Sequence, residues 1–441
     1  MVLPGTLDPC TTPGFLQFQC FQFVFAATAA TIVSGAIAER CQFFAYFAYS
    51  IILTGWVYPP VSHWAWDGSG WLAQTGFYYD FAGSGVVHLM GASCAIVGCY
   101  FMGPRRGRFN KKGEPIEMPG HSVPLAGLGG FILIFGFLAF NGGSQASISN
   151  EGDGDVVALA IVNTILGAST GGMTVLFINK FMLKQPWSFL MCLNGALAGN
   201  LLSSGIHENT ICLFFPGMVA LCGGCNYYEP WAALIVGGIG GIGFMLVHFG
   251  MLRLKLDDPL DAVAVHGAGG LVGILSVPWF MHAGLEEGQR GIFWDGGHFP
   301  EGEANVPWSV LGYNIAGSIC IMLWSFLWSF ILFGSLYWLK MLRVSTEDEF
   351  KGMDVIKHGE SAYPAAVIKS ILFALVFYVF AGLGRISICK RWQRQQKWRC
   401  ACEYEFKWAW IVDDNGWNQR GQEWRVLQQS LRDGAHDRDA F

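Results

Sequence analysis

Two histidines that lie inside long apolar stretches are the residues best suited to chemistry in this sequence. Asp80-Phe-Ala-Gly-Ser-Gly-Val-Val-His88 and Asp261-Ala-Val-Ala-Val-His266 share one order, in which an aspartate begins an apolar run and a histidine follows within it. A neutral imidazole donates a hydrogen bond at one ring nitrogen and accepts one at the other. An ionisable side chain within an apolar span usually marks a pathway or a relay. We therefore expect His88 and His266 to line a polar path, and the competing interpretation is that the pair ligates a heme or a metal.

The two aspartates are expected to act mainly as helix caps. A carboxylate at the start of a helix accepts hydrogen bonds from free backbone N–H groups and meets the positive end of the helix dipole. An electrostatic effect of Asp80 and Asp261 on a passing cation would be secondary. At the helical rise, Asp80 to His88 climbs about 12 Å and Asp261 to His266 about 7.5 Å, which places each imidazole nearer the membrane midplane. The two segments resemble a degenerate internal repeat, and transporters built from repeats bind their substrate at the repeat interface.

The elements that must position these residues are long and free of charge. Of 441 residues, 53% are hydrophobic and only 13% are charged, against about 25% in an ordinary soluble domain. Nine runs contain no Asp, Glu, Lys or Arg, and each exceeds the roughly 20 apolar residues that cross a bilayer: 9–38, 41–66, 81–104, 118–150, 156–179, 185–207, 230–252, 262–285 and 304–339. We predict an all-α polytopic membrane protein with about nine transmembrane helices, surrounded by lipid. The net charge of −5 gives no basic surface for nucleic acid.

The basic residues predict the orientation of the chain. Fourteen Lys and Arg residues fall in alternate loops on one side of the nine spans or follow the ninth span, whereas the opposite loops carry only Arg290. By the positive-inside rule, the N-terminus lies outside and the segment after the ninth span is cytoplasmic. The stretch 209–228 is also uncharged. Counting it as a span would place the later basic loops outside, so we expect it to be an external loop.

The predicted external loops are crowded with aromatic and acidic residues, Trp66 and Asp67 among them. An aromatic belt at the lipid headgroups accounts for most such rings. The alternative is a vestibule that collects cations, because ring faces and carboxylates both attract positive charge.

Other motifs give no sign of an enzyme or of a cofactor. Cys222-Gly-Gly-Cys225 is a single pair without a second one, which is weak evidence for a metal site. Gly238-Ile-Gly-Gly-Ile-Gly243 matches a dinucleotide fingerprint, but it lies within an apolar run with no strand before it. It suits close helix packing in lipid instead. His248, near the end of the same run, is expected to have a structural role.

Seven motifs, in order along the chain, resemble the ammonium transporter (Amt/Mep/Rh) family, and the Amt branch in particular. They are Ser34-Gly-Ala-Ile-Ala-Glu39-Arg40, His63-Trp-Ala-Trp66, the Asp80–His88 string, Phe140-Asn-Gly-Gly-Ser144, Asn194-Gly-Ala-Leu-Ala-Gly199, Asp257-Asp-Pro-Leu-Asp261 with His266, and Gly352-Met-Asp-Val-Ile-Lys-His-Gly359 with Tyr363. The resemblance implies a plasma-membrane homotrimer in which each subunit has its own pore between two inverted five-helix halves. That family has eleven spans, and the first two have no counterpart before Phe21, so nine are expected here.

The resemblance also implies the site residues. The ammonium-binding residues would be Trp66, Phe25, Phe21 and Asn194. Phe25 would also be one of two stacked gating rings, and the second would fall near Leu190, with Phe189 beside it. His88 and His266 would be the twin pore histidines, and Asp80 the buried aspartate.

The function that the resemblance implies is transmembrane transport of ammonium or ammonia, with methylammonium as an analogue. Ammonium would bind at an external aromatic site, lose its proton, and pass the histidines as ammonia. Two alternatives stay open: an ammonium sensor or non-conducting paralogue, and a heme-binding membrane redox protein.

We divide the chain into four parts. Residues 15–340 are the transmembrane domain, and 341–363 a cytoplasmic segment like that of the family. The apolar stretch 364–384 precedes six basic residues that a full span would export, so it is expected to be interfacial or re-entrant. Residues 385–441 form a charged tail.

Overall fold

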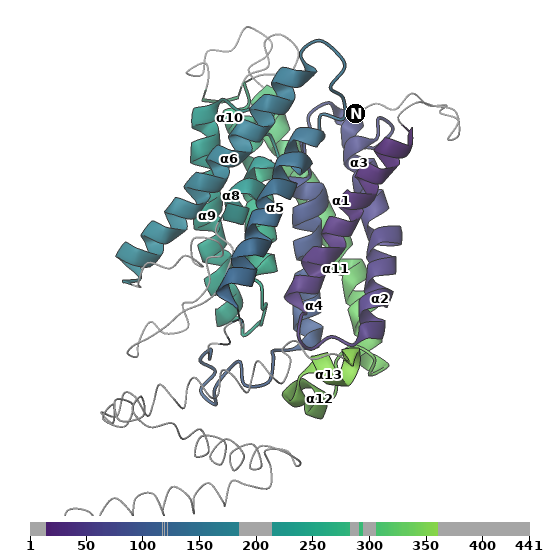
Figure 1. Cartoon of the computed structure of the whole chain (residues 1–441). Coiled ribbons are helices and arrows are strands. Elements are labelled where there is room, and N and C mark those ends of the chain that lie inside the picture. The colour runs from purple at the N-terminus through teal and green to yellow at the C-terminus, as the bar shows by residue number, and fades with distance from the viewer. Residues whose placement is uncertain are drawn as a thin grey trace, which may run out of the picture. The chain divides into compact units, whose positions relative to one another are not determined.

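The computed structural model describes residues 15–116, 118, 120, 122–184, 214–282, 291–293 and 306–359, and every regular element within these ranges is helical. The helices run side by side in a bundle, and two short helices, α12 and α13, lie at one end of it (Figure 1). In chain order the elements are α1 (Phe15–Ala36), α2 (Phe43–Ile52), η1 (Leu53–Val57), α3 (Tyr58–Trp66), η2 (Ala73–Thr75), η3 (Ser84–Leu89), α4 (Met90–Met102), α5 (Val123–Gly143), α6 (Asp153–Phe177), η4 (Ile178–Met182), α8 (Phe214–Leu221), α9 (Pro230–Arg253), η5 (Val263–Ala268), α10 (Gly269–Phe280), α11 (Val306–Trp338), α12 (Thr346–Lys351) and α13 (Met353–His358).

The helices follow the charge-free runs of the sequence. Among the residues that the structure describes, six stretches are long and apolar enough to cross a bilayer: Ser84–Met102, Pro124–Gly143, Asp153–Met182, Pro230–Arg253, Val263–Phe280 and Val306–Trp338. Two further predicted spans coincide with α1 and with the continuous helical stretch from α2 to α3. The predicted span 185–207 lies outside the described residues, as do the segments 364–384 and 385–441 and Arg290. The all-helical membrane architecture is therefore confirmed.

The two histidine-bearing helices occupy the centre of the bundle. The most apolar part of Ser84–Met102 is 83% buried within the protein, and that of Val263–Phe280 is 67% buried. The corresponding part of Pro124–Gly143 is only 28% buried. Glycine makes the close contact between them possible. A Cβ on Gly270 would lie 2.5 Å from the carbonyl oxygen of Ser84, and one on Gly273 would lie 2.2 Å from the Ser84 hydroxyl. Small residues at such crossings let helix backbones approach.

The segment 209–228 is not simply an external loop, and this prediction was wrong for its helical part. Its described residues include α8, which packs against α6, α9 and α10, and Met218, Val219 and Leu221 within it are fully buried. The alternation of basic and non-basic loops shows only whether the chain crosses the membrane between them. It does not show whether an uncharged segment between two spans is helical or buried. The eight residues of α8 that the structure describes rise about 12 Å of the roughly 30 Å hydrocarbon core.

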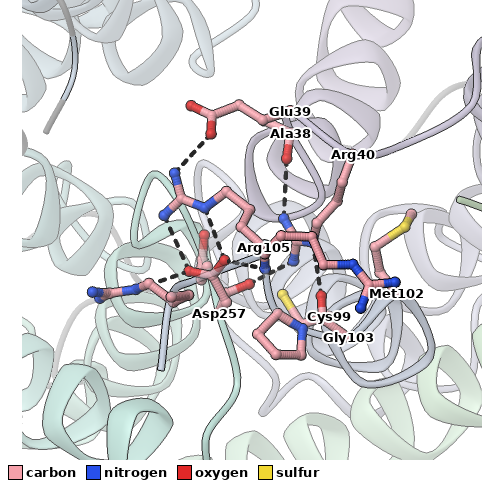
Figure 2. Close-up of polar contacts among 12 residues, drawn as sticks. Ala38, Glu39, Arg40, Cys99, Met102, Gly103, Arg105 and Asp257 are labelled. Carbon is pink, nitrogen blue, oxygen red and sulfur yellow. Dashed lines mark hydrogen bonds and ion pairs between the residues drawn. The ribbon is translucent and has the colours of Figure 1, made fainter. Parts of the chain in front are cut away.

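The loops at the end of the bundle that carries Arg40 are joined by a buried charge cluster (Figure 2). The Asp257 carboxylate accepts hydrogen bonds from the backbone N–H, Nε and one Nη of Arg105 at 2.8–3.1 Å, and from Nε of Arg108 at 3.2 Å. Arg40 donates to the Asp257 carbonyl oxygen, and Arg105 also pairs with Glu39. Burial alone would raise the pKa of the Asp257 carboxyl, but Arg105 holds that pKa below its ordinary value.

Candidate functional site

His88 and His266 meet at the centre of the bundle. Nδ1 of one ring lies 3.0 Å from Nδ1 of the other, and the ring planes are 10° apart with centroids at 5.0 Å. Each histidine lies in a π-helical turn, η3 or η5, that precedes a regular central helix. Such turns are frequent at functional sites because they displace one side chain from the helical register. The structure thus brings together two residues 178 positions apart in the chain.

A line of aromatic rings leads to this pair. Phe25 of α1 stacks on Phe140 of α5, with centroids 4.0 Å apart and planes 13° apart, and Phe140 lies 5.7 Å from the His88 ring. Phe25 also contacts Phe21, with centroids 4.5 Å apart, and Trp66, with centroids 5.8 Å apart in a T-shaped arrangement. The rings of Trp66, Phe25 and Phe140 and the His88 imidazole are therefore consecutive neighbours.

The ring stacked on Phe25 comes from a motif whose role we did not predict. The sequence placed a second gating ring near Leu190, with Phe189 beside it, and the hydrogen-bonding residue at Asn194, but all three lie outside the described residues. Phe140 begins the Phe140-Asn-Gly-Gly-Ser144 motif at the end of α5. The motif was visible in the sequence, but the contact between α1 and α5 that gives Phe140 its position was not.

Asp80 caps the segment that carries His88, as predicted. Its carboxylate accepts backbone hydrogen bonds from Gly83 at 3.0 Å, Gly85 at 2.9 Å and Val86 at 3.0 Å. Its carbonyl oxygen accepts a hydrogen bond of 2.7 Å from the indole nitrogen of Trp66. Gly83 has φ of +92°, a conformation that favours glycine and turns the chain back over the carboxylate. The Asp80 loop therefore fixes both the start of η3 and the Trp66 ring.

Asp261 does not have the capping role we expected of it. Its carboxylate lies 2.8 Å from Nδ1 of His248 on α9, so these two residues join neighbouring helices. The cap of the η5 segment is Asp258, which accepts backbone hydrogen bonds from Leu260 at 3.3 Å and Val263 at 2.7 Å. Asp258 stands eight residues before His266, as Asp80 does before His88. This equal spacing could have identified Asp258 as the cap. We chose Asp261 instead because, like Asp80, it directly precedes an apolar run.

The geometry of the histidine pair does not suit heme or metal ligation between the rings. Imidazole nitrogens bind a metal at about 2.0–2.1 Å, so an ion between two of them would separate them by roughly 4 Å. The two Nδ1 atoms are instead in direct hydrogen-bonding contact. Among the described residues, no group of three His, Cys, Asp or Glu side chains is placed to hold a metal ion. The arrangement suits hydrogen bonding to a small molecule that passes along the ring edges.

The fold and the site together define a class, the polytopic membrane transport proteins, in which buried ionisable groups on central helices mark a pathway. The sequence model of the Ammonium Transporter Family matches residues 8–204 and 211–363 of the chain. The chain belongs to this family, and the resemblance noted from its motifs is confirmed.

Named relatives and solved structures agree with this assignment. A putative ammonium transporter 1 of Caenorhabditis elegans is 43% identical over 357 residues, which are 78% of this chain and 62% of the relative, so the chain spans less than two thirds of that protein. Ammonium transporter 1 member 3 of Solanum lycopersicum is 35% identical over 369 residues, 79% of this chain and 75% of the relative. Among solved structures, a Sensor Amt Protein aligns with a TM-score of 0.66 at 32% identity over 79% of each chain. The crystal structure of Candida albicans Mep2 gives a TM-score of 0.61 at 27% identity, over 76% of this chain and 67% of the other.

Proposed function

We propose that the chain transports ammonium across a membrane and that its path runs past Trp66, between Phe25 and Phe140, and along His88 and His266. The observation that carries the proposal is the contact of the Phe25–Phe140 stack with His88, which is fully buried and hydrogen-bonded to His266. Family membership supports the choice of substrate. The chain is proposed to act as a transporter and not as an enzyme.

The first step is capture of the ion by aromatic rings. Phe21 and Trp66 both contact Phe25, and we propose that ring faces at this end of the line bind the ion. A cation over such a face gains about 0.5–2 kcal/mol, which replaces part of its hydration. Asn194 is proposed as a hydrogen-bonding side chain at the same site.

The stacked rings of Phe25 and Phe140 then act as a gate. At a centroid separation of 4.0 Å nothing passes between them, so one ring must rotate to admit a molecule. Beyond them the surroundings are apolar, and a bare ammonium ion is costly to move into such surroundings whereas neutral ammonia is not. Desolvation favours the neutral form, so we propose that the ion loses its proton near the gate.

Ammonia then passes the two imidazoles, whose neutral form leaves a ring nitrogen able to form a hydrogen bond with it. Their mutual hydrogen bond holds the two rings in nearly parallel planes, so that their edges form a continuous polar strip in apolar surroundings. Potassium would be rejected, because it has no proton to lose and no hydrogen bond to donate.

We further propose that the chain works as a plasma-membrane homotrimer. The distribution of basic residues supports an N-terminus outside the cell and a cytoplasmic segment at 341–363. The trimer rests on the resemblance to the family. Cross-linking of the purified protein in detergent, followed by mass measurement, tests it, and a monomer at all cross-linker concentrations would contradict it.

Uptake of methylammonium by cells that lack their own ammonium transporters tests the function. Wild type is expected to restore uptake, His88→Ala and His266→Ala to lower it, and Trp66→Leu to raise the KM by about fivefold, which corresponds to loss of about 1 kcal/mol of cation–π attraction. His63→Ala is the matched control, because the His63 side chain is exposed and pairs with Asp67. Wild-type protein at the cell surface without uptake would contradict transport and favour a sensor. Unchanged uptake in all three variants would contradict the proposed path.

A further inference from the structure

The ring nitrogen of His88 that does not face His266 has a partner of its own. Nε2 of His88 lies 3.4 Å from Sγ of Cys222, the residue that directly follows α8. Sγ also lies 3.2 Å from Oδ1 of Asn141 on α5, and Nδ2 of Asn141 lies 2.8 Å from the hydroxyl of Thr164 on α6. His88, Cys222, Asn141 and Thr164 are all fully buried. A row of polar atoms therefore extends from the histidine pair into the protein interior.

The oxygen acceptors in this row favour one direction of hydrogen bonding along it. Thr164 donates its one hydroxyl proton to the Ala160 carbonyl oxygen at 2.6 Å, so it accepts from Asn141 and fixes the amide with Oδ1 toward Cys222. The Cys222 thiol donates to Oδ1 of Asn141 or to the Met218 carbonyl oxygen at 3.4 Å. In both cases the thiol donates its one proton to an oxygen, and Sγ then accepts from Nε2–H of His88 across the 3.4 Å contact.

This assignment reaches the second histidine. A neutral His88 that carries its proton on Nε2 has a bare Nδ1, which accepts from Nδ1–H of His266 across their 3.0 Å contact. His266 then has a bare Nε2. The His88 ring cannot easily turn to escape this arrangement, because it lies nearly parallel to Phe137 at 5.7 Å as well as to His266.

We propose that Cys222, with Asn141 and Thr164 behind it, is a positioning residue that holds His88 as the Nε2–H tautomer and thereby makes Nε2 of His266 the free hydrogen-bond acceptor of the pair. The inference rests on the proposed function, since that acceptor would receive an N–H of the passing ammonia. It also limits proton movement along the row. A proton that entered at Nε2 of His266 and displaced the proton of His88 would arrive at a thiol that can pass it only to a neutral amide or carbonyl oxygen.

Nitrogen-15 spectroscopy of labelled histidine in the full-length protein in lipid tests the tautomers directly, and His88→Ala and His266→Ala assign the signals. Wild type is expected to show His88 protonated on Nε2 and His266 on Nδ1. Cys222→Val, which has no hydrogen-bonding group, is expected to weaken the preference of His88 for Nε2–H by about fivefold, the change that one net hydrogen bond produces. Cys222→Ser is expected to restore it, and Cys225→Val, equally buried three residues away, to leave it unchanged.

Methylammonium uptake by the same variants is the second measurement. Uptake is expected to fall in Cys222→Val and to recover in Cys222→Ser. A wild-type His88 protonated on Nδ1, or equal tautomer ratios in wild type and Cys222→Val, would overturn the proposal. Loss of uptake in both Cys222 variants with unchanged tautomers would also overturn it, because side-chain size would then be the cause. The spectra do not depend on transport, so a protein that transports nothing but shows the assigned tautomers would contradict only the proposed function.

Discussion

Replacement of Asp80 removes acceptors from three backbone N–H groups at once. In Asp80→Ala, the amides of Gly83, Gly85 and Val86 lose the carboxylate oxygens at 2.9–3.0 Å from them. Asp80 is buried, so water does not readily replace it. Each buried donor left unpaired costs about 1–3 kcal/mol, which gives about 3–9 kcal/mol in total. That is a large part of the roughly 5–15 kcal/mol by which native proteins are stable. Asp80→Asn keeps one side-chain oxygen as an acceptor, so at least one backbone donor is left unpaired. We expect the free energy of unfolding to fall by about 1–3 kcal/mol for that donor.

Thermal unfolding of the purified protein in detergent, followed by tryptophan fluorescence, measures these differences. We expect the order of Tm values to be wild type, Asp80→Asn and then Asp80→Ala, with the alanine variant poorly folded. Asp67→Asn, at an exposed loop position, is the control and should leave Tm unchanged. Asp80→Asn should also weaken methylammonium uptake, because it removes part of the hydrogen bonding that fixes the loop whose backbone carbonyl oxygen at position 80 accepts from the Trp66 indole. An Asp80→Ala protein with the wild-type Tm would refute the reasoning.

Two further predictions concern the buried charge cluster and the contact between the central helices. Asp257→Asn removes the charged partner of Arg105, whose side chain is 9% exposed while that of Asp257 is fully buried; breaking such a pair costs about 3–5 kcal/mol, and Tm should fall accordingly. Because Arg105 lowers the pKa of Asp257, the carboxylate contributes its full stability above its unfolded-state pKa of about 4, and this contribution is lost as the pH falls through the lower folded-state value. Wild type should therefore lose more Tm than Asp257→Asn on acidification below about pH 4, and equal losses would contradict this. Gly270→Val should abolish folded protein in size-exclusion chromatography, because its Cβ would meet backbone atoms of Ser84 and Leu89 at 2.5 and 2.9 Å. Gly250→Ala, with open space around it, is the control, and a monodisperse Gly270→Val protein would contradict the contact.

The spans could be predicted from the sequence because the bilayer imposes a strong local rule. A helix that crosses lipid must be long and nearly free of charge, and the charge-free runs obey that rule wherever the structure describes them. The helix α8 escaped the rule because its sequence, uncharged but interrupted by Pro216 and followed by Gly223 and Gly224, is also typical of a loop. Its burial depends on glycines, such as Gly167 and Gly217, that let neighbouring backbones touch.

The candidate site could be predicted only for residues whose type is unusual in its sequence surroundings and therefore points to few roles. His88 and His266 stood out because an ionisable group in an apolar run needs a reason to be there. Cys222 and Phe140 did not, because a buried thiol and a buried ring are ordinary core residues until their neighbours are known. The cap at Asp258 was missed for a related reason. Three aspartates lie within five positions, and only the path of the backbone decides which one faces the free N–H groups.

Ammonium flux through the purified full-length protein in liposomes tests the central claim most directly. An inward ammonium gradient is applied, and a trapped pH-sensitive dye reports the change in internal pH over time. We predict that wild-type liposomes respond faster than empty ones, that His63→Ala matches wild type, and that His88→Ala and His266→Ala alter the response. Correctly folded wild-type protein that responds no faster than empty liposomes, or a His88→Ala, His266→Ala double variant that is indistinguishable from wild type, would contradict a path along the paired imidazoles.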